Sequence, residues 1–418
     1  MALRAGEPAS TRPGPREEPP LVNGVRPFLV ERFFAKHEFT ADYMLGSSDA
    51  DAWSVAELLQ LARSRGDTDA EREWAEVGLG YTESAGHPTL RAAAAALYGG
   101  PIGAEQVLCA VPVEGIFLAM SSLLAHGDVV VAMMPAYQCL YEVARSKGCT
   151  VVPWRASYEP GVGWSFSLAD LRSALVDDEG APREVRMVVT NFPHNPTSWM
   201  PSNAEHVELV EICRERGAVL FSDEMYWGMA LESGERPVSS CVRYERAVTL
   251  SGLSKPHGLP GLRVGWLATQ DVQAMSRLQQ CKDYVTICGS APSEALAIIA
   301  LRHGEALLAR AWETTRANRP HLRAFCEEFS GLFEWTPEPS RGLVALVVLR
   351  GWAASMGAQS FADWSATTAS CVLVPSDCFE APSPPAVRFG LGRRNFPEAL
   401  ARLGQHLRAQ GAQGPAAP

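Results

Sequence analysis

The stretch LSGLSKPHGLPGLRVGW, residues 250–266, places one lysine among small, uncharged side chains, eight positions before an arginine. A lysine in a loop is usually a solvated surface residue, because its charged amine is costly to bury. Here the lysine follows an apolar run that is typical of a buried strand and precedes a glycine-rich turn. Lys255 and Arg263 are therefore expected to have functional partners elsewhere in the chain.

Runs rich in β-branched residues alternate with amphipathic helical segments through the middle of the chain. One such segment, SNAEHVELVEICRERG (202–217), begins with a serine cap and ends at glycine. This alternation predicts an α/β fold of three layers, with a mostly parallel sheet between helices. The predicted strands are residues 128–134, 149–154, 185–192, 218–224, 247–252 and 262–269.

The pattern changes near Pro292, where a long helical stretch precedes a few short strands at 342–349, 371–376 and 386–392. We interpret this part as a smaller α+β C-terminal domain. The predicted organisation is a disordered Pro-rich tail (1–24), an N-terminal arm packing on the small domain (25–50), a large domain (51–292), the small domain (293–408) and a disordered tail (409–418).

The composition of the 418 residues, 47% hydrophobic and 20% charged, is that of an ordinary globular protein. The net charge of −10 argues against nucleic acid or an anionic membrane as partner and favours a small-molecule substrate. No apolar run is long enough to span a bilayer, and the N-terminus lacks the apolar segment of a signal peptide. The ten cysteines form no C-x-x-C pair and no metal-spaced cluster. We expect a cytoplasmic protein with reduced cysteines and no metal.

Polar residues follow three of the predicted strands. Asn195 comes after MVVT, Asp223 after VLFS and Lys255 after VTLSG. Ligands of open parallel sheets bind beyond the carboxyl ends of the strands, so we expect these side chains to converge. Each has an ordinary alternative: a turn residue for Asn195, a structural salt bridge for Asp223 and a surface amine for Lys255.

Together these residue types describe one ligand. A lysine amine attacks the carbon of an aldehyde, a buried carboxylate such as Asp223 pairs with a protonated ring nitrogen, and Arg263 can hold a phosphate. Tyr226, three residues after Asp223, can place its hydroxyl beside the same ligand. An aldehyde, a pyridine nitrogen and a phosphate occur together in pyridoxal phosphate (PLP).

The motifs SGLSKPHGLPGLRVG (251–265), NFPHNPTS (191–198) and SDEMY (222–226) resemble those of the class I and II aminotransferases, which are fold-type I PLP-dependent enzymes. The resemblance extends from about residue 25 to 408, with the motifs in the expected order. It implies the PLP-dependent transferase type I fold, with residues 51–292 as the cofactor-binding domain.

The resemblance implies a role for each matching residue around the cofactor ring. Lys255 would form the internal aldimine and carry a proton between the substrate Cα and cofactor C4′. Asp223 would keep the pyridine nitrogen protonated. Asn195 and Tyr226 would hydrogen-bond the 3′-oxygen, and Tyr137 would stack on the ring.

The phosphate and the substrate would use further residues. Arg263, Ser251 and the backbone N–H groups of Val113 and Glu114 would bind the phosphate, and Tyr81 would reach the phosphate of the partner subunit. A homodimer with shared active sites follows from that role of Tyr81. On the substrate side, Arg388 would bind the α-carboxylate through two hydrogen bonds, beside Asn195 and Gly46.

Three positions depart from the family pattern. The phosphate turn reads CAVPVEG (109–115), with Val111 and Pro112 in place of glycine and a small hydroxyl residue, and with the acidic Glu114 nearby. Gly252 stands where a phosphate-binding serine often occurs, so Ser251 or Ser254 would have to compensate. Ser198 replaces the last glycine of the asparagine motif.

Two reactions fit the same residues. The first is transamination between an L-amino acid and a 2-oxo acid. The second is a cyclase or lyase reaction, since NFPHNP, LSKPHGLPGLRVGW and KDYVTICGSAPSE (282–294) also resemble capreomycidine synthase, which eliminates and cyclises a hydroxylated arginine. The Asp223–Tyr226 pair leads us to favour transamination. A non-catalytic effector sensor is a third reading, which we do not favour, because regulators of that kind carry a DNA-binding domain before the fold and residues 1–24 are predicted to be a disordered tail.

The substrate side chain would be recognised by residues 44–53, by Tyr137 and by residues 283–288 of the partner subunit. Asp49 or Asp51 would favour a basic side chain, although acidic loop residues are usually solvated. GLPGLRVG lacks the spacing of a dinucleotide-binding loop.

Overall fold

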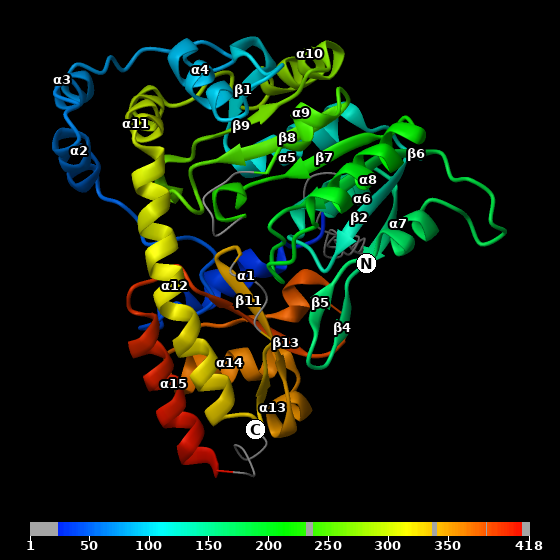
Figure 1. Ribbon diagram of the computed structural model, residues 1–418, viewed down its shortest axis with the longest axis vertical. Helices are drawn as coiled ribbons and strands as arrows, with labels where there is room; N and C mark the ends of the chain where they lie inside the picture. Colours follow the sequence, from blue (N-terminus) through cyan, green and yellow to red (C-terminus); the bar gives the residue numbers. More distant parts are fainter. Residues whose placement is uncertain (1–23, 231–236, 337–340, 382, 412–418) are drawn as a thin grey trace, which may run out of the picture.

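The computed structural model describes residues 24–230, 237–336, 341–381 and 383–411. Its larger sheet has seven strands in the order β1-β9-β8-β7-β6-β2-β3 (Figure 1). Strands β3, β2, β6, β7 and β8 run parallel, and β9 is antiparallel to both of its neighbours. The strands are β1 Val107–Ala110, β2 Val129–Met134, β3 Thr150–Arg155, β6 Val185–Asn191, β7 Val219–Asp223, β8 Ala247–Gly252 and β9 Gly265–Ala268.

The predicted α/β class with a mostly parallel sheet is confirmed. Two details differ from the prediction. Strand β1 has only four residues and was missed, because its apolar run is too short to separate from a helix start. Strand β9 begins at Gly265 rather than at residue 262, because Pro260–Leu262 form the 3-10 turn η4 and Arg263 has φ = +58°.

Helices cover both faces of the larger sheet. Alternate residues of β2 point to opposite faces: Val130 and Ala132 join the core under α5, α6 and α10, whereas Val131 and Met133 join the core under α7 and α8. Pro112 opens α5, where its missing N–H costs no hydrogen bond. The helices are α5 Pro112–Leu123, α6 Cys139–Ser146, α7 Leu168–Ala174, α8 Asn203–Glu215 and α10 Val272–Lys282.

A third apolar core lies at the β1 and β9 edge of the sheet. Trp266 and Val107 contribute to it from the strands, and Leu296 and Ile299 contribute from α11. Although the domain limits stay a prediction, this packing associates α11 with the larger sheet. The elements here are α2 Val55–Ser64, α3 Ala70–Ala75, α4 Pro88–Ala96, η2 Ala104–Gln106, α9 Ser240–Arg243 and α11 Ala291–Arg302. The 3-10 turn η3 (Trp227–Met229) lies elsewhere and contacts α12 (Gly304–Glu328).

The C-terminal part contains a four-stranded antiparallel sheet in the order β10-β11-β13-β12. The long helix α12 runs from the large sheet to this part (Figure 1). The core of this C-terminal part is rich in aromatic rings, including Phe333, Phe361 and Phe389. The elements are α12 Gly304–Glu328, β10 Phe333–Glu334, β11 Val344–Leu349, α13 Gly351–Met356, α14 Ala358–Thr368, β12 Val374–Pro375, η5 Ser376–Phe379, β13 Ala386–Gly390 and α15 Phe396–Gln410.

The N-terminal arm lies against the small sheet. After α1 (Leu29–His37), Tyr43 forms a parallel bridge with Cys371, and the Gly46 N–H donates to the Val372 carbonyl at 2.7 Å. Backbone pairing therefore holds residues 43–46 next to β12.

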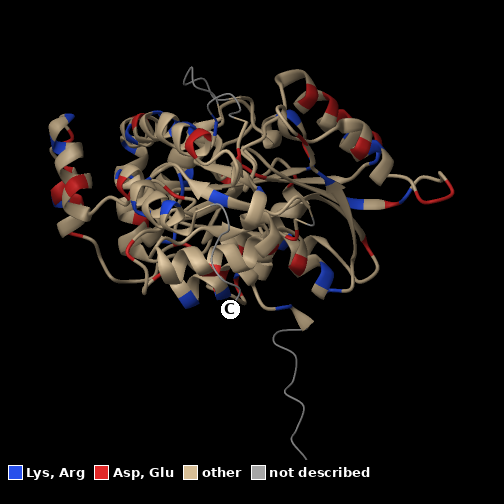
Figure 2. Ribbon diagram, turned by 90° about the horizontal axis from the view of Figure 1, so that it is seen from below, with Lys and Arg blue, Asp and Glu red and all other residues tan. Residues whose placement is uncertain are grey.

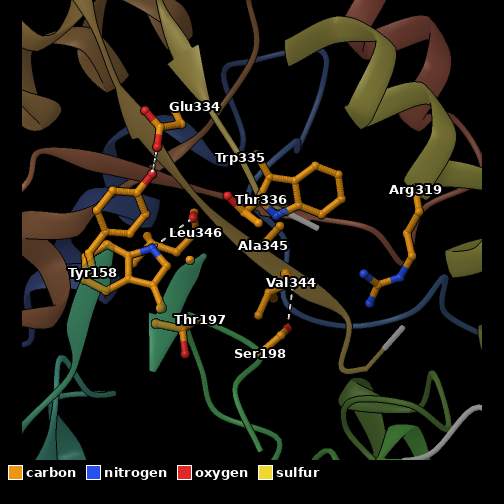
Figure 3. A pocket seen from close by; sticks show the side chains of 12 residues that line it. Tyr158, Thr197, Ser198, Arg319, Glu334, Trp335, Thr336, Val344, Ala345 and Leu346 are labelled. Atoms are coloured by element: carbon orange, nitrogen blue, oxygen red, sulfur yellow. Dashed lines mark hydrogen bonds between the residues drawn. The ribbon is translucent and has the colours of Figure 1, made fainter. Parts of the chain in front are cut away.

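A hairpin formed by β4 (Ser157–Glu159) and β5 (Gly163–Ser165) follows β3 of the larger sheet and is hydrogen-bonded to the smaller sheet. Trp164 Nε1 donates to the Leu346 carbonyl at 3.2 Å, and Tyr158 donates its hydroxyl proton to Glu334 (Figure 3). The Ser198 hydroxyl donates to the Val344 carbonyl at 2.5 Å. Strand β11 is thus hydrogen-bonded both to the hairpin and to Ser198, the last residue of the NFPHNPTS motif (191–198).

Acidic and basic residues both occur along several outer helices (Figure 2). Exposed pairs such as Arg172–Glu208 and Arg408–Glu328 illustrate this mixture. Each such pair contributes only about 0–1 kcal/mol to stability. No helix in the described ranges is both long and apolar enough to cross a membrane.

Candidate active site

The carboxyl ends of the parallel strands bring the expected polar residues together. In the sheet register, Asn191 at the end of β6 pairs with Asp223 at the end of β7, and Asp223 pairs with Leu250 of β8. Asn191 also accepts a hydrogen bond from the Asn195 N–H at 2.7 Å. The edge therefore presents Asn195 and Asp223 beside the loop that carries Lys255.

Asp223 is a buried carboxyl, 6% exposed, whose Oδ1 accepts the Met225 N–H at 3.0 Å. Burial raises the pKa of Asp223 to about 7, while the Met225 N–H and the positive charge of Lys255 oppose the shift. The described residues place no cation in hydrogen-bonding contact with this carboxyl. A protonated ring nitrogen would supply the missing partner and stabilise the carboxylate.

Arg388 on β13 is 2% exposed, so it is not a solvated residue at a strand end. Its Nη1 donates to Asn195 Oδ1 at 2.9 Å, and its Nη2 and Nε donate to the Gly46 carbonyl at 2.7 and 3.2 Å. Burial lowers the pKa of Arg388. The structure therefore joins Arg388, Asn195 and Gly46, as the resemblance implied, and all these acceptors are uncharged oxygens.

Lys255 is half-buried, and its Nζ donates to Ser48 Oγ at 2.9 Å. Its charge also acts on Asp223. Ser48 lies within residues 44–53, the predicted wall of the substrate pocket, but its hydroxyl was not among the predicted site groups. The available signal was a polar pair, Ser47–Ser48, next to Gly46.

Two tyrosines complete this side of the site. Tyr226 is 3% exposed, and its hydroxyl has no hydrogen-bond partner among the described residues. An unsatisfied buried hydroxyl costs about 1–3 kcal/mol, so a ligand oxygen would stabilise it. Tyr137 is half-buried, and the centre of its ring lies 4.9 Å from the centre of the Phe28 ring. Burial raises the pKa of Tyr137 well above its usual value, with smaller contributions from the nearby Tyr226 and Asp223.

Two of the residues assigned to the phosphate, Glu114 and Arg263, line one cavity. Its volume is about 370 Å³, and Val111 and Lys282 also line it. Arg263 is exposed, and its Nη1 donates to the Pro260 carbonyl at 3.0 Å.

Glu114 is engaged at the start of α5. Its Oε2 accepts the Val111 N–H at 3.2 Å, and its Oε1 accepts the Thr286 hydroxyl at 2.5 Å. Val113 packs at the edge of the core under α5. The carboxylate of Glu114 thus caps the helix whose N–H groups were assigned to the phosphate.

Of the two serines expected to compensate for Gly252, Ser254 has the freer hydroxyl. Ser251 interacts with the Tyr98 hydroxyl, whereas Ser254 is 5% exposed and its hydroxyl has no hydrogen-bond partner in the described ranges. Gly252 itself has a packing reason, because a Cβ there would lie 2.8 Å from Gly265 Cα.

Ser198 adopts φ = +63°, the left-handed conformation that glycine takes easily. Its hydroxyl bond to the Val344 carbonyl offsets part of the backbone strain. Ser198 therefore holds a backbone conformation that glycine would adopt with less strain.

Tyr81 is 93% exposed. Leu79 and Tyr284 are also exposed, at 85% and 94%. Ser84 Oγ donates to Asp283 Oδ1 at 2.9 Å, which brings the two exposed segments side by side.

Asp49 and Asp51 are both paired within the chain. Arg393 Nη2 donates to both carboxylate oxygens of Asp49 at 3.0 Å, and Arg394 Nε donates to Asp51 at 2.9 Å. Both carboxylates therefore already have a cationic partner within the chain.

The chain belongs to the aminotransferase class I and II family, whose sequence profile matches residues 67–402. It is 29% identical over 318 residues to capreomycidine synthase from Streptomyces vinaceus, covering 76% of this chain and 78% of that protein. It is also 25% identical over 226 residues to aspartate aminotransferase from Sulfolobus acidocaldarius, covering 53% of this chain and 55% of that protein.

Two solved structures are similar over nearly the whole chain. A PLP-dependent aminotransferase from Streptococcus suis matches with a TM-score of 0.82 and 28% identity, covering 92% of this chain and 98% of that chain. The PLP-dependent cyclase OrfR matches with a TM-score of 0.80 and 28% identity, covering 96% and 100%. The fold is the fold-type I of PLP-dependent enzymes, and the protein is a PLP-dependent transferase.

The residues at the sheet edge fit this cofactor. Among the described residues, the buried hydroxyls of Tyr226 and Ser254 have no hydrogen-bond partner and the buried carboxyl of Asp223 has no cation in hydrogen-bonding contact, while Lys255 supplies the amine. A pyridine ring with a hydroxyl, a phosphate and an aldehyde offers a partner to each of them.

Proposed function

We propose that the protein is an aminotransferase that moves an amino group between an L-amino acid and a 2-oxo acid. The observation that carries this proposal is the buried Arg388 guanidinium, which is bonded to neutral oxygens of Asn195 and Gly46 and lies next to the segment that contacts Lys255. A buried guanidinium without a carboxylate among these partners is suited to bind the carboxylate of an amino or oxo acid.

Each side chain has a defined task in this reaction. PLP, when bound, supplies an aldehyde that reacts with amines and a ring that withdraws electrons from the substrate Cα. With PLP bound, Asp223 would keep the ring nitrogen protonated, and Tyr226 would donate its hydroxyl proton to the ring oxygen. Arg388 would bind the substrate carboxylate. Lys255 would remove the proton from the substrate Cα and deliver a proton at the position of cofactor C4′.

The active protein in this proposal is a cytoplasmic homodimer. Tyr81 and the segment 283–288 project from one subunit into the site of the other, and Arg263 and Ser254 bind the phosphate. The exposure of Leu79, Tyr81 and Tyr284 supports this arrangement, because clustered exposed apolar side chains are typical of an interface.

A second candidate is elimination and cyclisation of an amino acid. Its support is the similarity to capreomycidine synthase and to the cyclase OrfR, which extends over most of the chain. Both reactions begin with removal of the Cα proton by Lys255. They differ in whether a proton returns to the cofactor or a group leaves from the substrate β-carbon.

The test is a half-reaction without an oxo-acid acceptor. The purified protein loaded with PLP is mixed with single amino acids, including arginine and hydroxyarginine, while the cofactor spectrum and the products are followed. Conversion of the cofactor to its amine form, with one oxo acid per site, is expected for an aminotransferase. Continued turnover that releases water, ammonia or a cyclic product would instead establish the cyclase or lyase.

A further inference from the structure

The N-terminal arm brings a hydroxyl group to the amine of Lys255. Lys255 Nζ donates to Ser48 Oγ at 2.9 Å, although 207 residues separate the two in the chain. Both residues are only half-buried, so their contact is not a consequence of tight packing in a water-free core.

Backbone hydrogen bonds fix the segment on both sides of Ser48. The Gly46 N–H donates to the Val372 carbonyl at 2.7 Å, and the Ala50 N–H donates to the carbonyl of Lys255 itself at 3.1 Å. The Asp51 N–H donates to the Gly392 carbonyl at 3.0 Å. Ser48 is therefore held at a set position relative to the backbone of Lys255.

Ser48 also lies next to the group that Arg388 contacts. The Gly46 carbonyl, two residues before Ser48, accepts two hydrogen bonds from Arg388. In the proposed function Arg388 holds the substrate carboxylate and Lys255 attacks the Cα proton. The segment 46–48 thus connects the carboxylate site to the amine, the two groups that flank the substrate Cα.

The neighbouring side chains are engaged elsewhere. Ser47 Oγ bonds Asp49 and Arg393, and Asp51 bonds Arg394. A serine hydroxyl accepts a hydrogen bond from an ammonium and donates one to a neutral amine. Ser48 can therefore keep its contact whether or not the amine has gained the Cα proton.

We propose that Ser48 is a positioning residue for Lys255. Its hydroxyl holds the free amine facing the substrate Cα while Lys255 is detached from the cofactor. This inference rests on the proposed role of Lys255 as the group that binds the cofactor and moves the Cα proton, and it applies equally to transamination and to cyclisation.

The first test measures how fast the cofactor-free protein captures PLP. Stopped-flow absorbance follows the capture, and borohydride reduction with peptide mass analysis locates the bond. We expect S48A to capture PLP about tenfold more slowly, the size of one hydrogen bond to a charged group. S48C, which keeps the size but has a weaker hydrogen-bonding sulfur, should lie between S48A and the unchanged protein. S276A removes an exposed hydroxyl on α10, which accepts a hydrogen bond from Gln280 and does not touch Lys255, and it should stay within about twofold.

The second test separates kcat from KM under steady-state conditions. We expect S48A to lower kcat about tenfold and to leave KM within about twofold, because the amine and not the carboxylate site is affected. Circular dichroism checks that each variant folds, and S48C replaces S48A if the latter does not.

The failures of the two proposals differ. Capture at the unchanged rate on Lys255 by S48A or S48C, with unchanged kcat, would overturn the role of Ser48 alone. A reduced protein in which PLP is bonded to another lysine would overturn the proposed function, and the role of Ser48 with it.

Discussion

The ring side and the phosphate side of the candidate site are built differently. On the ring side, Asp223 and Arg388 are buried, and backbone or amide groups hold them in place. On the phosphate side, Arg263 is exposed, and Glu114 already caps a helix. Buried groups in fixed positions contribute most to catalysis, because their interactions are strong and need no rearrangement. We therefore expect large effects on turnover from ring-side substitutions and smaller effects on cofactor affinity from phosphate-side substitutions.

The largest effect is expected for Lys255→Ala. Without the amine the protein loses its covalent bond to PLP and the base for the Cα proton, so turnover should fall by about 10²–10⁴-fold or more. Borohydride reduction followed by mass analysis measures the bond, and product formation measures turnover. K36A, which removes an exposed amine that pairs with Asp363, is the matched control. Undiminished turnover in K255A would contradict the assignment.

Asp223→Asn should have the next largest effect. An amide of the same shape cannot stabilise a protonated ring nitrogen, so we expect kcat to fall on the order of 100-fold while the fold is kept. D223E retains the charge and serves as the control for loss of packing. Near-normal kcat in D223N, with bound PLP verified by absorbance, would remove the role of this carboxyl.

Arg388→Gln should raise KM for the amino acid by about 10–100-fold, because the hydrogen bonds to a charged carboxylate contribute about 1.5–3 kcal/mol. R388K keeps the charge but loses the two-pronged geometry, and it should give an intermediate KM. The comparison is made with an amino acid and with the corresponding amine, which lacks the carboxylate. An equal change for both compounds would show that Arg388 does not bind the carboxylate.

Arg263→Ala should have the smallest effect. Because the guanidinium is exposed, we expect the dissociation constant of PLP to rise about tenfold and kcat at saturating PLP to change little. Equilibrium titration of cofactor-free protein at low and high salt measures this, and R277A on α10 is a control with the same change of charge. A loss of kcat as large as that of D223N would erase the difference between the two sides.

The sheet and its functional edge were predictable from local patterns. Six of the seven strands of the larger sheet were expected, because runs such as DVVVAMM combine β-branching with a length that fits a strand. The convergence of Asn195, Asp223 and Lys255 followed from the rule that parallel strands end at one edge.

Contacts between distant segments were not predictable in the same way. Strand β1 was missed for a local reason, because its apolar run was too short to assign. The ion pair between Asp49 and Arg393, in contrast, joins residues far apart in the chain. The bond between Ser198 and the Val344 carbonyl is of the same kind. Such contacts depend on how the N-terminal arm and the small sheet pack on the larger one.

The sequence by itself determined the fold class, the family motifs and the types of residue at the ends of the strands, because these depend on short-range periodicity and spacing. Only the tertiary structure decided which oxygen faces Lys255, and that the Arg388 guanidinium donates to the side-chain oxygen of Asn195 and to the backbone carbonyl of Gly46. Those contacts bring together residues 48 and 255, and residues 46, 195 and 388, each from a different element. No local pattern encodes them, since each depends on the packing of complete elements against one another.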